Sequence, residues 1–137
     1  MTEAMDLIDR YYATWNDRNW DDYDSLLTAD ATEWASGGPS LQGIEEIVAF
    51  DKGWADAFPD ARITSLLKTS DGNTVISENR FVGAQTGPFH TSEGEVPPTG
   101  IQVEIPFVGV FELEGGRVKA ERIYYDRLGL LSQLDLL

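Results

Sequence analysis

Asp126 is the residue of this sequence best placed to act as a general acid or base. It ends the last predicted strand, and because side chains alternate along a strand, it shares a face with Tyr124 and Arg122. If that face lines an apolar cavity, loss of hydration disfavours the charged carboxylate and prepares it for proton transfer. The alternative role is structural. Asp is a preferred N-cap residue, and a helix is predicted to begin at Arg127.

Three other polar residues are candidates for contacts with a substrate. The amide of Gln85 cannot exchange a proton, but it could donate a hydrogen bond to a carbonyl or enolate oxygen. Alternatively, Gln85 is a polar strand end that meets solvent. His90 lies in a loop rich in Gly and Pro, where binding residues occur but a lone histidine is more often simply exposed. Arg122 could hold the catalytic carboxylate ionised, bind an acidic substrate, or form a surface ion pair with Glu104 or Glu112.

Several aromatic residues could form the walls of a flat, hydrophobic ligand site. Most large apolar side chains fill the core, so we expect only two or three of them to touch a ligand. The candidates are Tyr12, Trp15, Trp34, Trp54, Phe58 and Tyr124. Asp51 falls between Val48 and Trp54 on the apolar stripe of a predicted helix. Exposure at the edge of that helix is the default expectation, and exposure to the pocket is the alternative.

The elements that position these residues are three helices followed by a sheet. Met5, Ile8, Tyr12 and Trp15 recur with the helical period, which predicts a helix over residues 2–16. A short helix is predicted over 20–27, a short strand over 31–35, and a third helix from 43 until Pro59 ends it.

Everything after the third helix is strand-like, with strands predicted over 62–69, 74–85, 101–113 and 117–126. Asp71-Gly72 and Glu114-Gly115-Gly116 provide two of the turns, residues 87–100 form a long loop, and helical turns over 128–134 close the chain. A sheet with an apolar face has to be covered, and the helices are the available cover. The predicted fold class is therefore α+β, a curved antiparallel sheet wrapped over three N-terminal helices around a cone-shaped pocket.

Short motifs along nearly the whole chain resemble a known family. Tyr12-x-x-Trp15-Asn16, Asp22 and Leu26-Leu27 look like the opening of the nuclear-transport-factor-2-like cones. The later motifs, in this order, resemble the SnoaL-like polyketide cyclases, also called ester cyclases. They are Ala57-Phe58-Pro59-Asp60, Gln85-Thr86-Gly87, Pro97-Pro98-Thr99-Gly100 and Asp126-x-Leu128-x-Leu130-Leu131-x-Gln133-Leu134.

The resemblance implies a homodimeric cone without a metal or organic cofactor, whose relatives close rings on polyketide esters by intramolecular aldol condensation. It also implies an acid/base role for Asp126. Two positions depart from the pattern, because Gln85 and Trp34 stand where many members have a histidine. The loop between Gly87 and Pro97 is also longer than expected. Two functions therefore stay open: a cofactor-free enzyme acting on a hydrophobic carbonyl compound, or a non-catalytic small-ligand-binding or dimeric scaffold protein of the same fold.

Composition limits the other possibilities. The 137 residues suit a single domain, residues 1–137, and a hydrophobic content of 42% excludes disorder. With 24 acidic and 10 basic residues the net charge is −14, so nucleic acid and membrane surfaces are poor partners. The absence of Cys and the single His exclude disulfides, a thiolate nucleophile and the two-histidine zinc motifs. We expect a cytoplasmic protein from a salt-loving host, the alternative being an ordinary acidic cytosolic protein.

The sequence also bears on other enzyme classes and on assembly. No Gly-rich phosphate loop and no G-x-S-x-G motif is present. An epoxide-hydrolase site would need two Asp bridged by Arg, which Asp126 and Arg122 supply only in part. The strand over 101–113 is apolar on both of its faces at its centre, where Ile105 and Phe107 alternate with Val108 and Val110. A symmetric partner is therefore expected to cover the outer face of the sheet.

Overall fold

A curved sheet of six strands forms one layer of the computed structural model, which describes residues 2–137. The strands are β1 (Leu27–Ala35), β2 (Ser40–Gln42), β3 (Arg62–Asp71), β4 (Thr74–Ala84), β7 (Gln102–Glu114) and β8 (Arg117–Tyr125). Their order across the sheet is β2-β1-β8-β7-β4-β3. The β1–β8 pair is parallel and the other neighbours are antiparallel. This is the mixed α+β class that the sequence predicts.

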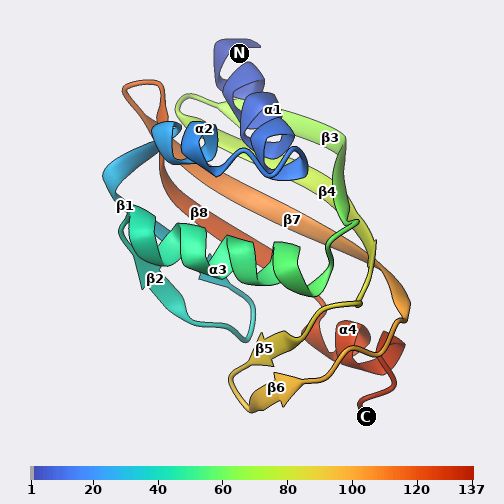
Figure 1. The fold of residues 1–137 in the computed structure, drawn as a ribbon. Helices are drawn as coiled ribbons and strands as arrows, with labels where there is room; N and C mark the ends of the chain where they lie inside the picture. The colour runs from blue at the N-terminus through green and yellow to red at the C-terminus, as the bar shows by residue number, and fades with distance from the viewer. Residues whose placement is uncertain (1) are drawn as a thin grey trace.

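Three helices cover one face of this sheet (Figure 1). They are α1 (Thr2–Asn16), α2 (Trp20–Ser25) and α3 (Ile44–Ala57). Helix α1 buries Ile8, Tyr12 and Trp15, the residues whose spacing predicts it, and α3 buries Ile47 and Ala55. Among residues 2–137, no helix is both long enough and apolar enough to cross a membrane.

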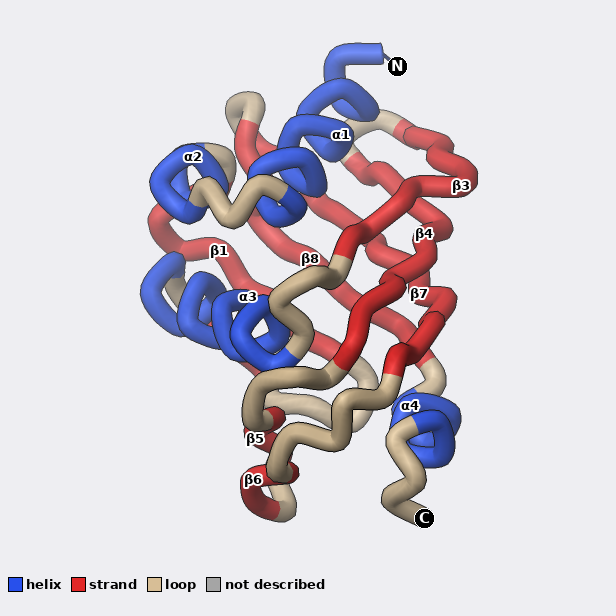
Figure 2. Tube along the Cα trace, turned by 45° about the vertical axis from the view of Figure 1, so that its right-hand side comes forward, coloured by secondary structure: helices blue, strands red, loops and turns tan. Residues whose placement is uncertain are grey.

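A small hairpin and a fourth helix lie at one end of the sheet (Figure 2). The hairpin consists of β5 (Phe89–Thr91) and β6 (Gly94–Val96), and the helix is α4 (Arg127–Gln133). The segment predicted as a loop therefore contains an ordered two-stranded element, which Arg127 joins to α4 through a 2.7 Å ion pair with Glu93. Strand β1 also starts earlier than predicted, at Leu27, because Leu27 already pairs with Val118 of β8.

An irregularity in β8 decides which of its residues face the helices. Val118 pairs with Leu113 of β7, but the next pair is Ala120 with Glu112, so Lys119 is an extra residue in the ladder. A bulge reverses the alternation, and Glu121 is buried three residues after Val118. The odd-numbered residues from 121 to 125 therefore face the helices, whereas the catalytic hypothesis for Asp126 required residues 122, 124 and 126 to do so.

Candidate active site

A pocket opens between the sheet and the three N-terminal helices. The empty space inside it, including the part open to solvent, is about 640 Å3. Its walls are largely aromatic, and no Lys, Arg or His belongs to the described residues that line it. The lining residues are Tyr11, Tyr12, Trp15, Tyr23, Ala35, Phe50, Asp51, Trp54, Ile63, Phe81, Ile105, Phe107, Glu121, Ile123 and Tyr125. An apolar cavity with a few polar groups is the usual form of a small-molecule site.

Two carboxyl groups belong to the wall of this pocket, and a third lies beside one of them in the sheet. Asp51 comes from α3 and Glu121 from β8, and both line the cavity. Glu33 of β1 is the direct neighbour of Glu121 across the parallel ladder. All three side chains are buried, with exposed fractions of 8%, 4% and 2% for Asp51, Glu121 and Glu33. Residues 2–137 contain no group of three or more His, Cys, Asp or Glu arranged to hold a metal ion.

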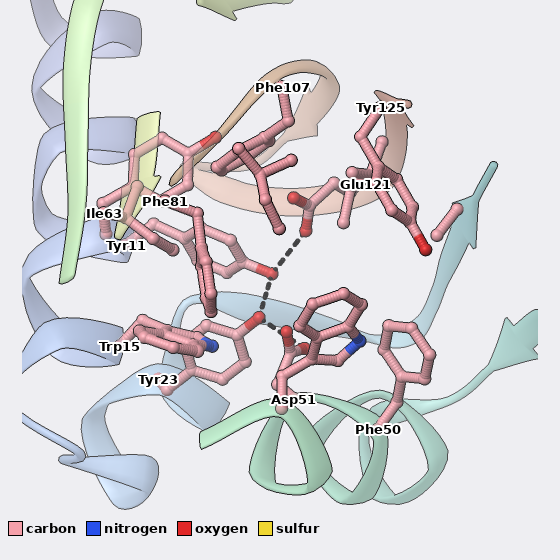
Figure 3. A pocket seen from close by; sticks show the side chains of 15 residues that line it. Tyr11, Trp15, Tyr23, Phe50, Asp51, Ile63, Phe81, Phe107, Glu121 and Tyr125 are labelled. Atoms are coloured by element: carbon pink, nitrogen blue, oxygen red, sulfur yellow. Dashed lines mark hydrogen bonds between the residues drawn. The ribbon is translucent and has the colours of Figure 1, made fainter. Parts of the chain in front are cut away.

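Two tyrosine hydroxyl groups connect the pocket carboxyls (Figure 3). The hydroxyl of Tyr11 lies 2.8 Å from Oε1 of Glu121 and 2.6 Å from the hydroxyl of Tyr23. The Tyr23 hydroxyl donates to Oδ2 of Asp51 at 2.8 Å. The two rings are stacked with their centres 4.5 Å apart. An unbroken hydrogen-bonded chain therefore runs from β8 through α1 and α2 to α3.

Burial gives the two carboxyl groups of the pocket wall different protonation states. Loss of hydration raises the pKa of Asp51 to about 6, against the opposing effect of hydrogen bonds with Tyr23, Glu33 and Trp15. Burial, and then the charge of Asp51, raises the pKa of Glu121 to about 8. Near neutral pH the pocket wall therefore carries one ionised carboxylate, Asp51, beside one protonated acid, Glu121.

Glu33 is also held in its neutral form. Both of its oxygens are buried, and no donor reaches them when the group is a carboxylate. A protonated Glu33 can donate to Glu121 or Asp51 instead. Burial, followed by the charges of Asp51 and Glu121, raises the pKa of Glu33 well above its usual range.

The structure corrects the predicted orientation of Asp126. The side chain is exposed and caps α4, with Oδ1 accepting a hydrogen bond from the Gly129 backbone N–H at 2.8 Å. It does not belong to the wall of the pocket. The capping alternative is therefore the one that the structure supports, and the prediction that Asp126 faces the cavity is wrong.

Gln85 is buried, but it holds a loop together instead of facing the pocket. Its amide donates to the carbonyl oxygens of Gly87 and Pro97 at 2.9 and 3.2 Å. Its Oε1 accepts from the backbone N–H and the hydroxyl of Thr99 at 3.1 and 2.7 Å. The predicted contact with a substrate oxygen and the solvent-exposed alternative are both wrong, because these bonds occupy both ends of the amide.

The two predicted cationic contacts lie outside the aromatic pocket. His90 is exposed, as its alternative predicts, and lies 3.4 Å from Glu95 across the β5–β6 hairpin. It borders a second cavity of about 500 Å3, which shares several lining residues with the first. Arg122 points to the outer face of the sheet and pairs with Glu112 at 3.0 Å, which confirms the surface ion pair.

The six predicted aromatic residues divide into two groups. Tyr12, Trp15 and Trp54 belong to the pocket wall, and the expectation that two or three of the six touch a ligand stays a prediction. Phe58 is fully buried and stacks on Trp54 without lining the cavity. Trp34 and Tyr124 lie on the outer face of the sheet with their rings 5.2 Å apart, so their prediction as pocket residues is wrong.

Glu33 and Glu121 are not among the candidates predicted from the sequence, and helix-edge exposure is the default expectation for Asp51. A signal was present for Asp51, which continues the 3.6-residue stripe of Ile47 and Trp54. Glu33 lies between Ala31 and Ala35 on the buried alternation of β1. The signal for Glu121 is weaker, because the bulge at Lys119 hides its register with Val118.

Comparisons with known proteins agree with this architecture. A family model described as SnoaL-like polyketide cyclase matches residues 5–134. A search of curated proteins found no significant match. A solved structure from Jannaschia sp. CCS1, described as a candidate SnoaL-like polyketide cyclase, is 26% identical with a TM-score of 0.89, covering 99% of this chain and 94% of its own.

Two further solved structures show the same fold at lower identity. TsrD from Streptomyces laurentii is 23% identical with a TM-score of 0.86, covering 100% of this chain and 98% of its own. A protein with a ketosteroid isomerase-like fold from Catenulispora acidiphila, solved in complex with trimethylamine, is 18% identical with a TM-score of 0.80. That match covers 96% of this chain and 93% of the other.

Proposed function

This chain belongs to the family of SnoaL-like polyketide cyclases, and we propose that its pocket transfers protons on an uncharged, hydrophobic carbonyl compound. Asp51 is the base and Glu121 is the acid. The observation that carries the proposal is that these two carboxyl groups share one apolar cavity while holding different protonation states. Enzymes that combine acid and base chemistry commonly separate the pKa values of two such groups.

The chemistry requires only the side chains already described. An ionised Asp51 removes a proton from the carbon next to the carbonyl, and a protonated Glu121 donates to the oxygen that gains charge. An aldol ring closure and an isomerisation both use this pair of steps. Neither step uses a cofactor, and each such general acid or base typically contributes ~10²–10⁴-fold to the rate.

The wall of the pocket selects against anions. It presents aromatic and aliphatic side chains, one ionised carboxylate and no cationic side chain among the described lining residues. An anionic substrate would lose its hydration and face the charge of Asp51, both of which are unfavourable in a site of low polarity. We therefore infer that the group bound inside the pocket is uncharged.

Proton exchange tests this proposal without knowledge of the natural substrate. Uncharged hydrophobic ketones are incubated with the protein in D2O, and NMR follows deuterium replacing the proton next to the carbonyl. We expect Asp51→Asn and Glu121→Gln, which keep the size of each group, to slow this exchange by ~10²-fold or more. Asp126→Asn serves as the matched control and is expected to retain the exchange rate. Equal rates in all three variants would contradict the assignment.

A second candidate function is the binding of a small amine without catalysis. Aromatic rings and buried carboxylates both attract an ammonium group, and the pocket combines them. The Catenulispora neighbour was solved with trimethylamine, which supports this alternative. Saturable binding of trimethylamine but not of tert-butanol, combined with no proton exchange on any ketone, would favour amine binding over catalysis.

The outer face of the sheet supports a homodimer. Trp34, Ile76 and Tyr124 are exposed there, with exposed fractions of 37%, 43% and 45%. Val108 and Val110 lie between them in register with β4 and β8. A second copy placed against this face would remove these apolar side chains from water.

A further inference from the structure

We propose that Tyr11 and Tyr23 form a proton relay that returns the proton taken up by Asp51 to Glu121 within the protein. This inference rests on the acid and base roles assigned above and concerns how the site is reset after each turnover. Without this role, the hydroxyl groups of the two tyrosines would only satisfy the hydrogen bonds of the buried carboxyl groups.

The hydrogen-bonded chain from Glu121 to Asp51 needs more protons than its two hydroxyl groups supply. Three contacts join Glu121, Tyr11, Tyr23 and Asp51, at 2.8, 2.6 and 2.8 Å. Each contact is a hydrogen bond and needs one proton, but two hydroxyl groups supply only two. The third proton therefore belongs to a carboxyl group at one end of the chain. With a proton on Glu121, every bond points toward Asp51; with a proton on Asp51, every bond points toward Glu121.

These two arrangements correspond to the site before and after a reaction. Before reaction Glu121 holds the proton and Asp51 is ionised. Asp51 accepts a proton from the substrate carbon and Glu121 gives its proton to the substrate oxygen, so the charge moves to Glu121. The two hydroxyl groups first turn so that Tyr23 donates to Tyr11 and Tyr11 donates to Glu121. The reset then shifts three protons by one bond each: Asp51 donates to Tyr23, Tyr23 to Tyr11, and Tyr11 to Glu121. No proton is gained or lost from the chain.

The surroundings favour this internal route over exchange with water. Tyr11 and Tyr23 are only 2% and 1% exposed, so solvent does not reach their hydroxyl groups freely. Their aromatic packing keeps the two oxygens at hydrogen-bonding distance, with Tyr11 also in edge contact with Phe111. Neighbouring hydrogen bonds in such a chain polarise one another, which supports a concerted shift.

Two further titratable groups, Glu33 and Tyr12, lie near the hydrogen-bonded chain. Glu33 of β1 is the neighbour of Glu121 across the β1–β8 ladder and is held neutral. Tyr12 of α1 accepts a hydrogen bond from Asn79 at 3.1 Å. Burial raises the pKa of Tyr11 and of Tyr23 well above the usual range, which keeps both hydroxyl groups protonated as donors. The lower pKa of Asp51 and the higher pKa of Glu121 fit the resting arrangement, in which Glu121 holds the proton.

A double-mutant cycle read by NMR tests the relay. The pKa of Glu121 is measured from its side-chain carboxyl 13C signal in the wild type, in Asp51→Asn, in Tyr23→Phe and in the double variant. In Asp51→Asn with Tyr23 intact, the new amide N–H donates to Tyr23 and reverses the direction of the hydrogen bonds, so Tyr11 donates to an ionised Glu121. Tyr23→Phe breaks the hydrogen-bonded chain. In that background Asp51→Asn changes the pKa of Glu121 only by removing the charge of Asp51.

We expect Asp51→Asn to lower the pKa of Glu121 by at least ~1 unit more with Tyr at position 23 than with Phe, a tenfold difference in proton affinity. Tyr11→Phe provides a second break in the chain should Tyr23→Phe fold poorly. Tyr12→Phe removes a nearby hydroxyl outside the chain and should leave the coupling as in the wild type.

Equal shifts in the two backgrounds would show that the carboxyl groups sense each other only through space, and would overturn the relay. This measurement uses no substrate. A failure of the ketone exchange assay with intact coupling would therefore count against the proposed function alone.

Discussion

Glu33 and Glu121 are direct neighbours across the parallel β1–β8 ladder, and both side chains are buried. Like charges placed opposite one another in a sheet are unfavourable, and burial increases this repulsion. The pair is therefore stable only while at least one member is protonated. The pair therefore holds a protonated carboxyl group at the pocket near neutral pH.

The first prediction concerns stability and pH. The pKa of Glu121 is about 8 in the folded chain and about 4.3 in an unfolded one, so the folded state binds the proton more tightly. The contribution of this proton to the free energy of unfolding is complete below the pKa of Glu121 in the unfolded chain. It is lost as the pH rises through 8. The melting temperature should therefore fall over this interval in high salt, and Glu121→Gln should flatten the fall. A slope that is the same in both proteins would count against a protonated Glu121.

The second prediction separates the helix cap, Asp126, from the proposed acid and base. Asp126→Asn should preserve the melting temperature because Asn also accepts the bond from Gly129, whereas Asp126→Ala should cost about 1 kcal/mol of stability. Chemical denaturation measures both variants. Neither substitution should change proton exchange on a ketone by more than about twofold, and a large loss in the Asn variant would restore Asp126 as an acid/base candidate.

The third prediction concerns assembly. Light scattering should return about twice the 15.2 kDa mass of one chain. Ile76→Glu and Tyr124→Glu place charges on the outer face of the sheet and should shift the mass toward one chain. Leu128 is 65% exposed on α4, outside the six-stranded sheet, so Leu128→Glu is the matched control. A wild-type protein that is monomeric at micromolar concentration would rule out this interface.

The fourth prediction concerns salt. The net charge of −14 makes the folded chain repel itself, and the Debye length falls from ~10 Å at 0.1 M to ~3 Å at 1 M salt. The melting temperature should therefore rise across this range of KCl. A flat or falling curve would contradict the prediction of an acidic surface adapted to salt.

The main elements of the fold could be predicted from the sequence because the periodicity is strong. The apolar stripe of α1 and the Asp71-Gly72 turn between β3 and β4 appear where the sequence places them. The β5–β6 hairpin could not be predicted in the same way. Gln85 and the Arg127–Glu93 ion pair hold its segment, and these contacts join residues far apart in the chain.

The site was harder to predict than the fold because one extra residue in β8 reverses which of its side chains face the helices. Counting by two from Asp126 selects Tyr124 and Arg122, and nothing in that count says which face is buried. The bulge at Lys119 then separates the register of Val118 from that of Glu121. The catalytic expectation fell on Asp126, whereas the buried carboxyl group of this strand is Glu121.

The most direct test of the account is the infrared spectrum of the protein near neutral pH. The C=O stretch of a protonated carboxyl group is distinct from the bands of carboxylates and amides, so it reports buried acids without any substrate. We predict that the wild type shows this absorption at pH 7, that Glu33→Gln and Glu121→Gln each remove part of it, and that Asp126→Asn leaves it unchanged. A wild-type spectrum without protonated carboxyl groups at this pH would contradict the central claim that the pocket holds an acid beside a base.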